Sequence, residues 1–379
     1  MQKRIAAVLC VLCLLFPCAA TAENVQPNGL DGVSGALLIE AGTGTPLYAK
    51  DADTRRAVAG LAKLPAILTL CQSADDGTLA LSGEISVSER AAGIPGPTAF
   101  LEAGERAAAE SLIKAAVMIS AGDAITALGE AVCGSESVFL NNVNATLRGC
   151  GIEAGVPDAV GTGLGLSARE LTVLGRAAVN SPTFLRYAVL YLDTFSHADG
   201  RETELVNANR LLRSYPGCIG LLTGSSQTDG YCGVFAAKQN GTVLIAAIIG
   251  AKDANVRTTA AAALLDYGFS GFRYERLAKA GEVFAEDVPV RGGEVRSVNL
   301  IAREDTTAIF RAGQGKLDRT VEAPEYLEAP VDADTACGRI VYRDTSGSEV
   351  GVLELFPERD VKKFGFREIL RRIADTFCG

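Results

Sequence analysis

The order of local patterns along the chain restricts its possible folds more than any other feature of the sequence. Two short apolar segments, 35–40 and 45–49, are joined by a Gly-rich turn and predict a pair of strands. Helical, Ala-rich patterns follow at about 60–73, 108–133, 136–149 and 167–181. Strand patterns then return at 218–222, 231–238 and 243–250, before a helical pattern at 257–267. This order predicts an antiparallel sheet flanked by helices, an α+β architecture.

The pattern changes near Lys279, where short alternating segments separated by Gly, Asp and Pro begin. These segments run from Val283 to Leu355 and predict a small all-β domain. Apolar residues at helical spacing between basic residues then predict a final amphipathic helix over 361–377. We therefore expect a main domain at 23–278, a β-rich domain at 279–358 and a basic amphipathic segment at 359–379.

The first residues have the layout of a secretory signal peptide. Lys3 and Arg4 precede an apolar run that ends near Pro17, and Ala20-Thr21-Ala22 is a small-residue cleavage pattern. We expect residues 1–22 to be removed and the mature chain to act outside the cytoplasm. A lipoprotein anchored through Cys18 and an uncleaved membrane anchor remain as alternatives.

Charge and cysteine content exclude some classes of function. The formal net charge of -9 argues against nucleic acid as a partner, because phosphate binding needs a basic surface. After residue 22 the sequence contains no CxxC pattern and no Cys/His cluster, so we expect neither a metal site nor a cofactor. His197 lies in a polar stretch and is expected on a surface loop. Cys218–Cys232 and Cys133–Cys150 are conceivable disulfides. The number of cysteines after residue 22 is odd, so at least one is free or pairs with another chain: Cys71, Cys133, Cys150, Cys218, Cys232, Cys337 and Cys378.

Three separated segments contain the residues that point to chemistry. Ala57–Leu64 includes Lys63, Val117–Ala124 includes Ser120, and Gly220–Gly224 lies on a predicted strand. These segments resemble the Ser-x-x-Lys, Ser-x-Asn and Lys-Thr-Gly motifs of the D-alanyl-D-alanine carboxypeptidases, which are low-molecular-mass penicillin-binding proteins of the peptidase S11 type.

The resemblance extends along nearly the whole mature chain. Other segments that are similar to the family are Ser167–Leu171, Asn207–Leu212, Arg257, Leu264–Phe269 and the β-rich C-terminal region. The resemblance implies a β-lactamase-like peptidase domain followed by a small β domain. It also implies ancestry in the removal of terminal D-alanine from the stem peptides of peptidoglycan.

The departures from the family pattern lie at the residues that perform the reaction. In the family, the first serine attacks the peptide carbonyl and the lysine of its motif takes the proton. Here Gly60 stands at the position of that serine, Gly122 at the position of the asparagine, and Leu222 at the position of the third-motif lysine. The retained residues are Lys63 and Ser120 as catalytic remnants, and Thr223 and Gly224 at the substrate-binding strand. Three losses at three separate motifs predict an inactive homologue.

Alternatives for the nucleophile remain open. Ser111 and Lys114 also match Ser-x-x-Lys, but they lie only nine residues before Ser120, in one predicted helical run. Ser120 could attack with Lys63 as its base, or Lys63 could be a purely structural lysine bonded to its neighbours.

Three functions follow from this interpretation. We expect an exported, inactive homologue that binds peptidoglycan stem peptides or a wall-associated protein. The alternatives are an active carboxypeptidase with a relocated nucleophile and a structural adaptor with a closed cleft. The segment 361–377 is expected to contact the outer face of the membrane or to dock on the β domain.

Overall fold

The computed structural model describes residues 27–312, 317–345 and 347–365. The chain divides into two compact units, Asn24–Ser270 and a unit that begins at Gly271. The predicted signal peptide at 1–22 lies outside the described residues.

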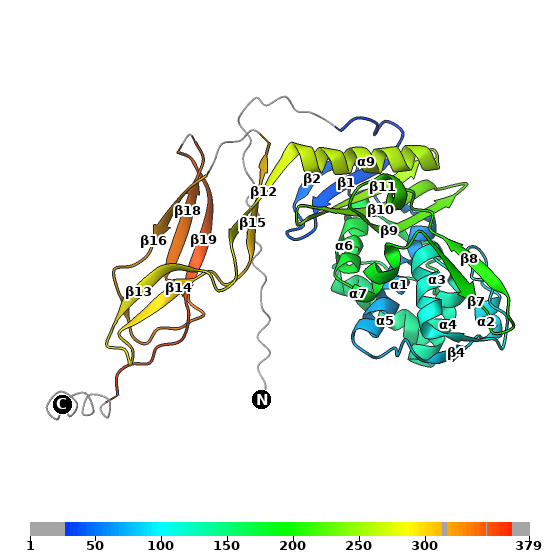
Figure 1. Ribbon diagram of the computed structural model, residues 1–379, viewed down its shortest axis with the longest axis horizontal. Helices are drawn as coiled ribbons and strands as arrows, with labels where there is room; N and C mark the ends of the chain where they lie inside the picture. Colours follow the sequence, from blue (N-terminus) through cyan, green and yellow to red (C-terminus); the bar gives the residue numbers. More distant parts are fainter. Residues whose placement is uncertain (1–26, 313–316, 346, 366–379) are drawn as a thin grey trace. The chain divides into compact units, whose positions relative to one another are not determined.

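The first unit is built on a five-stranded antiparallel sheet in the order β2-β1-β11-β10-β9 (Figure 1). The sequence-distant strands β1 and β11 lie side by side at its centre, with Gly35 opposite Ile249 and Glu40 opposite Leu244. Their apolar runs are buried along almost the whole length, as expected for strands covered on both faces. The strands are β1 (Gly35–Glu40), β2 (Pro46–Lys50), β9 (Cys218–Ser226), β10 (Gly230–Gln239) and β11 (Thr242–Ala251).

Helices cover both faces of this sheet. Neighbouring residues of β11 point to opposite sides: Ile245 meets Gly175 of α6, and Leu244 meets Gly268 of α9. The helices α1 to α7 lie on the α6 side, whereas α9 lies alone on the other (Figure 1). The helices are η1 (Ala59–Lys63, 3-10), α1 (Leu64–Asp75), α2 (Glu89–Ala92), α3 (Ala109–Ile119), α4 (Gly122–Cys133), α5 (Glu136–Gly149), α6 (Ala168–Val179), α7 (Pro182–Ala188), α8 (Leu211–Ser214) and α9 (Ala254–Gly271).

Short strand pairs complete the first unit. They are β3 (Arg56–Ala57) with β6 (Gly165–Leu166), β4 (Glu84–Ser86) with β5 (Arg106–Ala108), and β7 (Leu192–Ser196) with β8 (Glu202–Val206). Local sequence signals set several helix starts: Ser167 and Glu170 form a reciprocal capping box at α6, and the Ser135 hydroxyl caps α5. The predicted α+β architecture is confirmed.

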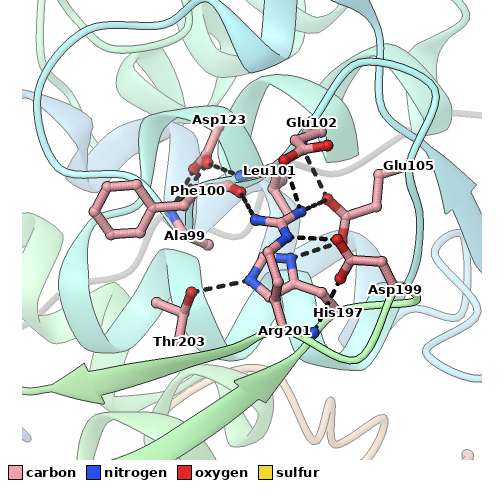
Figure 2. Close-up of polar contacts among 10 residues, drawn as sticks. All are labelled: Ala99, Phe100, Leu101, Glu102, Glu105, Asp123, His197, Asp199, Arg201 and Thr203. Carbon is pink, nitrogen blue, oxygen red and sulfur yellow. Dashed lines mark hydrogen bonds and ion pairs between the residues drawn. The ribbon is translucent and has the colours of Figure 1, made fainter.

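Two local predictions were wrong. The expected single helix over 108–133 is divided into α3 and α4, because Ser120 has φ 55° and ψ 41°, in the left-handed region. The expected exposed loop around His197 is instead the turn of the β7–β8 hairpin. Its imidazole is fully buried between Glu105 and Thr203, as Figure 2 shows.

The second unit is all β, which confirms the predicted C-terminal architecture. A six-stranded sheet has the order β16-β18-β19-β14-β13-β17, and β12 pairs with β15 in a separate ribbon. Leu277 and Phe310 of the ribbon join Leu300, Ile340 and Leu355 of the sheet in one apolar core. The strands are β12 (Phe272–Ala278), β13 (Val283–Arg291), β14 (Ser297–Ile301), β15 (Thr306–Arg311), β16 (Asp318–Glu322), β17 (Leu327–Glu328), β18 (Gly338–Arg343) and β19 (Glu349–Pro357).

The cysteine pairs considered from the sequence do not form. In the antiparallel pairing of β9 and β10, Cys218 lies opposite Ala237 and Cys232 opposite Gly224, so the two thiols belong to distant positions of the ladder. Cys133 and Cys150 stand at opposite ends of α5, and both are free. Cys378 lies outside the described residues.

The predicted final helix at 361–377 falls largely outside the described residues. Its first residues are not helical, because Val361 bridges Val331 and Lys363 bridges Gly293 as isolated strand pairs. Within the part of the chain that the structure describes, no helix is long and apolar enough to cross a membrane. The expected membrane contact of this segment stays a prediction.

Candidate functional site

Lys63 and Ser120 lie together although 57 residues separate them in the sequence. Lys63 ends η1, and its Nζ donates a hydrogen bond of 2.8 Å to the carbonyl oxygen of Ser120. The left-handed backbone of Ser120, between α3 and α4, presents this oxygen. Among the described residues, no hydrogen bond joins Lys63 Nζ to the Ser120 hydroxyl. The amine is therefore bound to the main chain and not to a nucleophile.

Burial changes the acidity of this amine. Lys63 is only 6 % exposed, and burial lowers its pKa from 10.5 to about 8, while the Asp123 carboxylate acts in the opposite direction. A lysine in this state is neutral in a substantial fraction of molecules near pH 8. With this pKa the amine could accept a proton from a hydroxyl, but Gly60 has no hydroxyl to supply one.

Gly60 and Gly224 bring the first and third segments into direct backbone contact. A Cβ added to Gly224 would lie 2.6 Å from the Gly60 nitrogen, which is closer than real atoms approach. A Cβ added to Gly60 would lie 3.4 Å from Gly224 Cα and 4.0 Å from the Thr223 oxygen, which are ordinary contacts. Position 224 therefore requires glycine for packing, whereas position 60 has room for a serine Cβ.

The surroundings of Gly122 are different. A Cβ on Gly122 would lie 2.7 Å from Ile94 Cγ2, 3.1 Å from Val160 Cγ1 and 3.3 Å from Lys63 Nζ. The side chains of Ile94 and Val160 therefore stand where a side chain at position 122 would begin, which is the position predicted for the motif asparagine. Neither residue was singled out from the sequence, because both belong to loops remote from the three motifs.

The third segment lies on the edge strand β9 and provides an apolar residue at the lysine position. Leu222 is opposite Val234 in the ladder and is 2 % exposed within the main apolar core. Thr223 is half-buried, opposite Gly233. The structure thus brings the three predicted segments together, but it retains only Lys63 as a cation from their motif positions.

Arg257 of α9 supplies a second buried cation near this strand. Its guanidinium donates to the carbonyl oxygens of Gly224, Cys232 and Ala208 at 3.3–3.4 Å. Burial lowers its pKa, and its Nε is without a hydrogen-bond partner among the described residues. In the same part of the chain, no carboxylate forms an ion pair with it. The sequence had indicated Arg257 only as a point of resemblance.

The lysine of the alternative Ser-x-x-Lys match, Lys114, is bound to residues outside the three motif segments. Ser111 and Lys114 lie in one helix, α3, and Lys114 Nζ binds the Asp193 carboxylate at 3.0 Å and the Thr194 carbonyl oxygen. Within the described ranges, no group of three or more His, Cys, Asp or Glu residues has the arrangement of a metal site.

Two family models match the chain. The model of the D-alanyl-D-alanine carboxypeptidase family matches residues 23–253, and that of the C-terminal domain of penicillin-binding protein 5 matches residues 272–363. The chain belongs to the D-alanyl-D-alanine carboxypeptidase family. Relatives in this family include D-alanyl-D-alanine carboxypeptidase DacF of Bacillus subtilis, 27 % identical with 98 % of each chain covered. DacC of Escherichia coli is 26 % identical and covers 96 % of this chain and 93 % of its own.

Solved structures support the same fold for this carboxypeptidase homologue. Penicillin-binding protein 5 of Haemophilus influenzae superimposes with a TM-score of 0.78 at 22 % identity, covering 88 % of this chain and 98 % of the other. Penicillin-binding protein 6B of Escherichia coli gives 0.70 at 20 % identity, with 90 % and 98 % covered. The predicted fold and family are confirmed.

Proposed function

We propose that this chain is an exported, catalytically inactive carboxypeptidase homologue that binds peptidoglycan stem peptides. The observation that carries the proposal is the geometry at Gly60 and Lys63. Acyl transfer needs a hydroxyl beside the lysine, and Gly60 has no side chain to supply one. Lys63 instead binds the Ser120 carbonyl oxygen at 2.8 Å. No acyl-enzyme forms on this arrangement.

Two buried cations support retention of a ligand. Lys63 has donors beyond its one hydrogen bond to Ser120, and the hydrogen bonds of Arg257 within the described residues all go to carbonyl oxygens, with the Tyr231 ring 5.8 Å from its guanidinium. Lys63 contacts Ser120 of the second segment, and Arg257 contacts Gly224 of the third. A buried cation is stabilised strongly by an anionic partner, so a peptide with a terminal carboxylate suits the site. The family relatives bear the name of an enzyme that acts on D-alanyl-D-alanine, which such a peptide contains.

A binding titration tests this proposal. An N-acylated tripeptide that ends in D-Ala-D-Ala is added to the purified mature chain, and heat of binding and released D-alanine are both measured. We expect saturable binding without release of D-alanine. Lys63→Met should weaken binding about tenfold or more, a loss of about 1.4 kcal/mol. The exposed Val138→Ala variant should bind as the parent does.

The other outcomes identify the competing functions. Release of D-alanine would establish an active enzyme, with the Ser120 hydroxyl as the first nucleophile to examine. Absence of binding would support the adaptor with a closed cleft.

A further inference from the structure

The two glycines that replace polar family residues differ in the space around them. A Cβ on Gly60 meets only ordinary contacts, the nearest at 3.4 Å. A Cβ on Gly122 meets a methyl group of Ile94 at 2.7 Å and one of Val160 at 3.1 Å. Both atoms belong to branched side chains, which are stiff about χ1. The loss at position 60 is thus only an absent side chain, whereas the space at position 122 is occupied.

The segment that carries Ile94 is fixed to the start of α4. The Gly122 nitrogen donates to the Pro97 carbonyl oxygen at 2.8 Å. The buried Asp123 carboxylate accepts from the amides of Ala99 and Leu101, at 3.0 and 3.1 Å (Figure 2). Arg201, in the turn between β7 and β8, donates to the carbonyl oxygen of Phe100 at 3.2 Å (Figure 2). Ile94 therefore belongs to a loop that is held close to position 122.

The loop that carries Val160 is fixed as firmly. The Asp158 carboxylate accepts from the amides of Val160 and Thr162, at 3.1 and 3.0 Å. Gly161 has φ +71°, and a Cβ there would lie 2.2 Å from the Ala62 oxygen, so this backbone lies directly on the residue before Lys63. The backbone of Val160 is therefore held next to η1 and Lys63.

We propose that Ile94 and Val160 form an apolar plug that occupies the volume of the lost asparagine side chain. The plug fills the space at position 122, whereas position 60 has room for a serine Cβ. Two side chains from separate loops, each held by its own aspartate, meet over one glycine.

The plug also determines what a ligand meets, on the basis of the proposed function. An asparagine amide would offer the ligand backbone both a donor and an acceptor, and two branched aliphatic side chains offer neither. A peptide in this cleft is therefore anchored by its carboxylate on the buried cations and rests against apolar side chains at position 122. Ile94 and Val160 are specificity-determining residues.

A thermal unfolding series on the full mature chain tests the steric claim without any activity. A helical Gly→Ala change ordinarily stabilises a protein, but Gly122→Ala should lower Tm by about 3 °C or more because it overpacks the site. With Ile94→Ala and Val160→Ala present, or either one if the pair does not fold, Gly122→Ala should no longer lower Tm. Gly149→Ala, whose Cβ would meet nothing within 4 Å, is the matched control in both backgrounds. An unchanged or raised Tm for Gly122→Ala in the parent would overturn the plug.

Acylation by a fluorescent penicillin provides the functional arm. Variant one combines Gly60→Ser, Gly122→Asn and Leu222→Lys, and variant two adds Ile94→Ala and Val160→Ala. We expect variant two to form the covalent adduct at least about tenfold faster. Equal rates would refute the plug and leave the proposed function intact. An adduct on the unmodified chain would instead refute the proposed function.

Discussion

At the residue scale, Lys63 is a buried lysine that follows a glycine, Gly60, at the position where the family motif predicts a serine. The amine stays buried, keeps one hydrogen bond to the Ser120 carbonyl oxygen, and has a pKa lowered to about 8. Burial of a charged amine costs free energy that a neutral amine does not cost. The burial of the Lys63 ammonium group therefore costs free energy, and no reaction at Gly60 accounts for this cost. An anionic ligand would reduce it.

This cost predicts a pH dependence of stability. Lys63 has a lower pKa in the folded chain, about 8, than its ordinary value of 10.5. Between these values the unfolded chain binds more protons, so the free energy of unfolding rises with pH, by about 3 kcal/mol at most. Urea unfolding between pH 7 and pH 10.5 should show this rise in the parent and a smaller one in Lys63→Met. Identical slopes in the two chains would contradict the assignment.

The three motif positions could be predicted from the sequence, but the side chains that surround them could not. Gly60, Gly122 and Leu222 could be located because each lies inside a recognisable segment. Ile94 and Val160 could not, since they come from loops that tertiary packing alone brings to Gly122. The sequence shows that position 122 is a glycine, and only the structure shows that Ile94 and Val160 fill the space beside it.

At the element scale, the β7–β8 hairpin holds the segment that borders the site. His197 Nδ1 bonds the Glu105 carboxylate at 2.7 Å, and its Nε2 bonds the Thr203 hydroxyl at 2.9 Å (Figure 2). Arg201 links the same hairpin to Glu102, Glu105 and the Phe100 carbonyl oxygen. A polar stretch in the sequence thus becomes a buried anchor, because Glu105, about 90 residues earlier, provides a hydrogen-bonding partner for His197 that the local sequence does not reveal.

Removal of this anchor should be costly. His197→Ala leaves the buried Glu105 carboxylate with one partner fewer and opens a cavity, so we expect a loss of about 2–4 kcal/mol in the free energy of unfolding. Hydrogen exchange at 94–101 should accelerate in the variant. Val138→Ala, at an exposed site on α5, should change the free energy by less than about 0.5 kcal/mol. A His197→Ala chain as stable as this control would refute the anchor.

Two helical glycines provide a matched test of packing between α4 and α5. A Cβ on Gly129 would lie 2.4 Å from the Phe139 ring, whereas a Cβ on Gly149 would meet nothing within 4 Å. Gly129→Ala should destabilise the chain by about 1–3 kcal/mol through overpacking, and Gly149→Ala should be neutral or stabilising by up to about 1 kcal/mol. Chemical denaturation of both variants measures the contrast. Equal effects would contradict the described interface.

Helix periodicity predicted the longer helices of the first unit but not the break between α3 and α4. The apolar pattern continues through Ser120, and neither a glycine nor a proline at that residue marks the left-handed backbone. The break is a tertiary feature, supported by the Gly122–Pro97 hydrogen bond and the Lys63–Ser120 contact. Without this break, Ser120 would not present its carbonyl oxygen to Lys63.

At the scale of the whole molecule, each unit has its own apolar core. The main core contains residues from Leu37 to Ile249, and the cores of the β unit contain residues from Leu277 onward. A separate core is the usual condition for independent folding. A chain of residues 23–271 should therefore unfold cooperatively and bind the stem tripeptide as the full chain does. Calorimetry and the same titration measure both, and a truncated chain without a thermal transition would contradict independence.

The most direct measurement of the central claim is the intact mass of the purified mature chain after incubation with a saturating β-lactam. We expect an unchanged mass, because Gly60 has no oxygen to acylate and Lys63 is bound to the Ser120 carbonyl oxygen. A stoichiometric increase equal to the mass of the drug would contradict the account, and the modified peptide would show whether Ser120 had become the nucleophile.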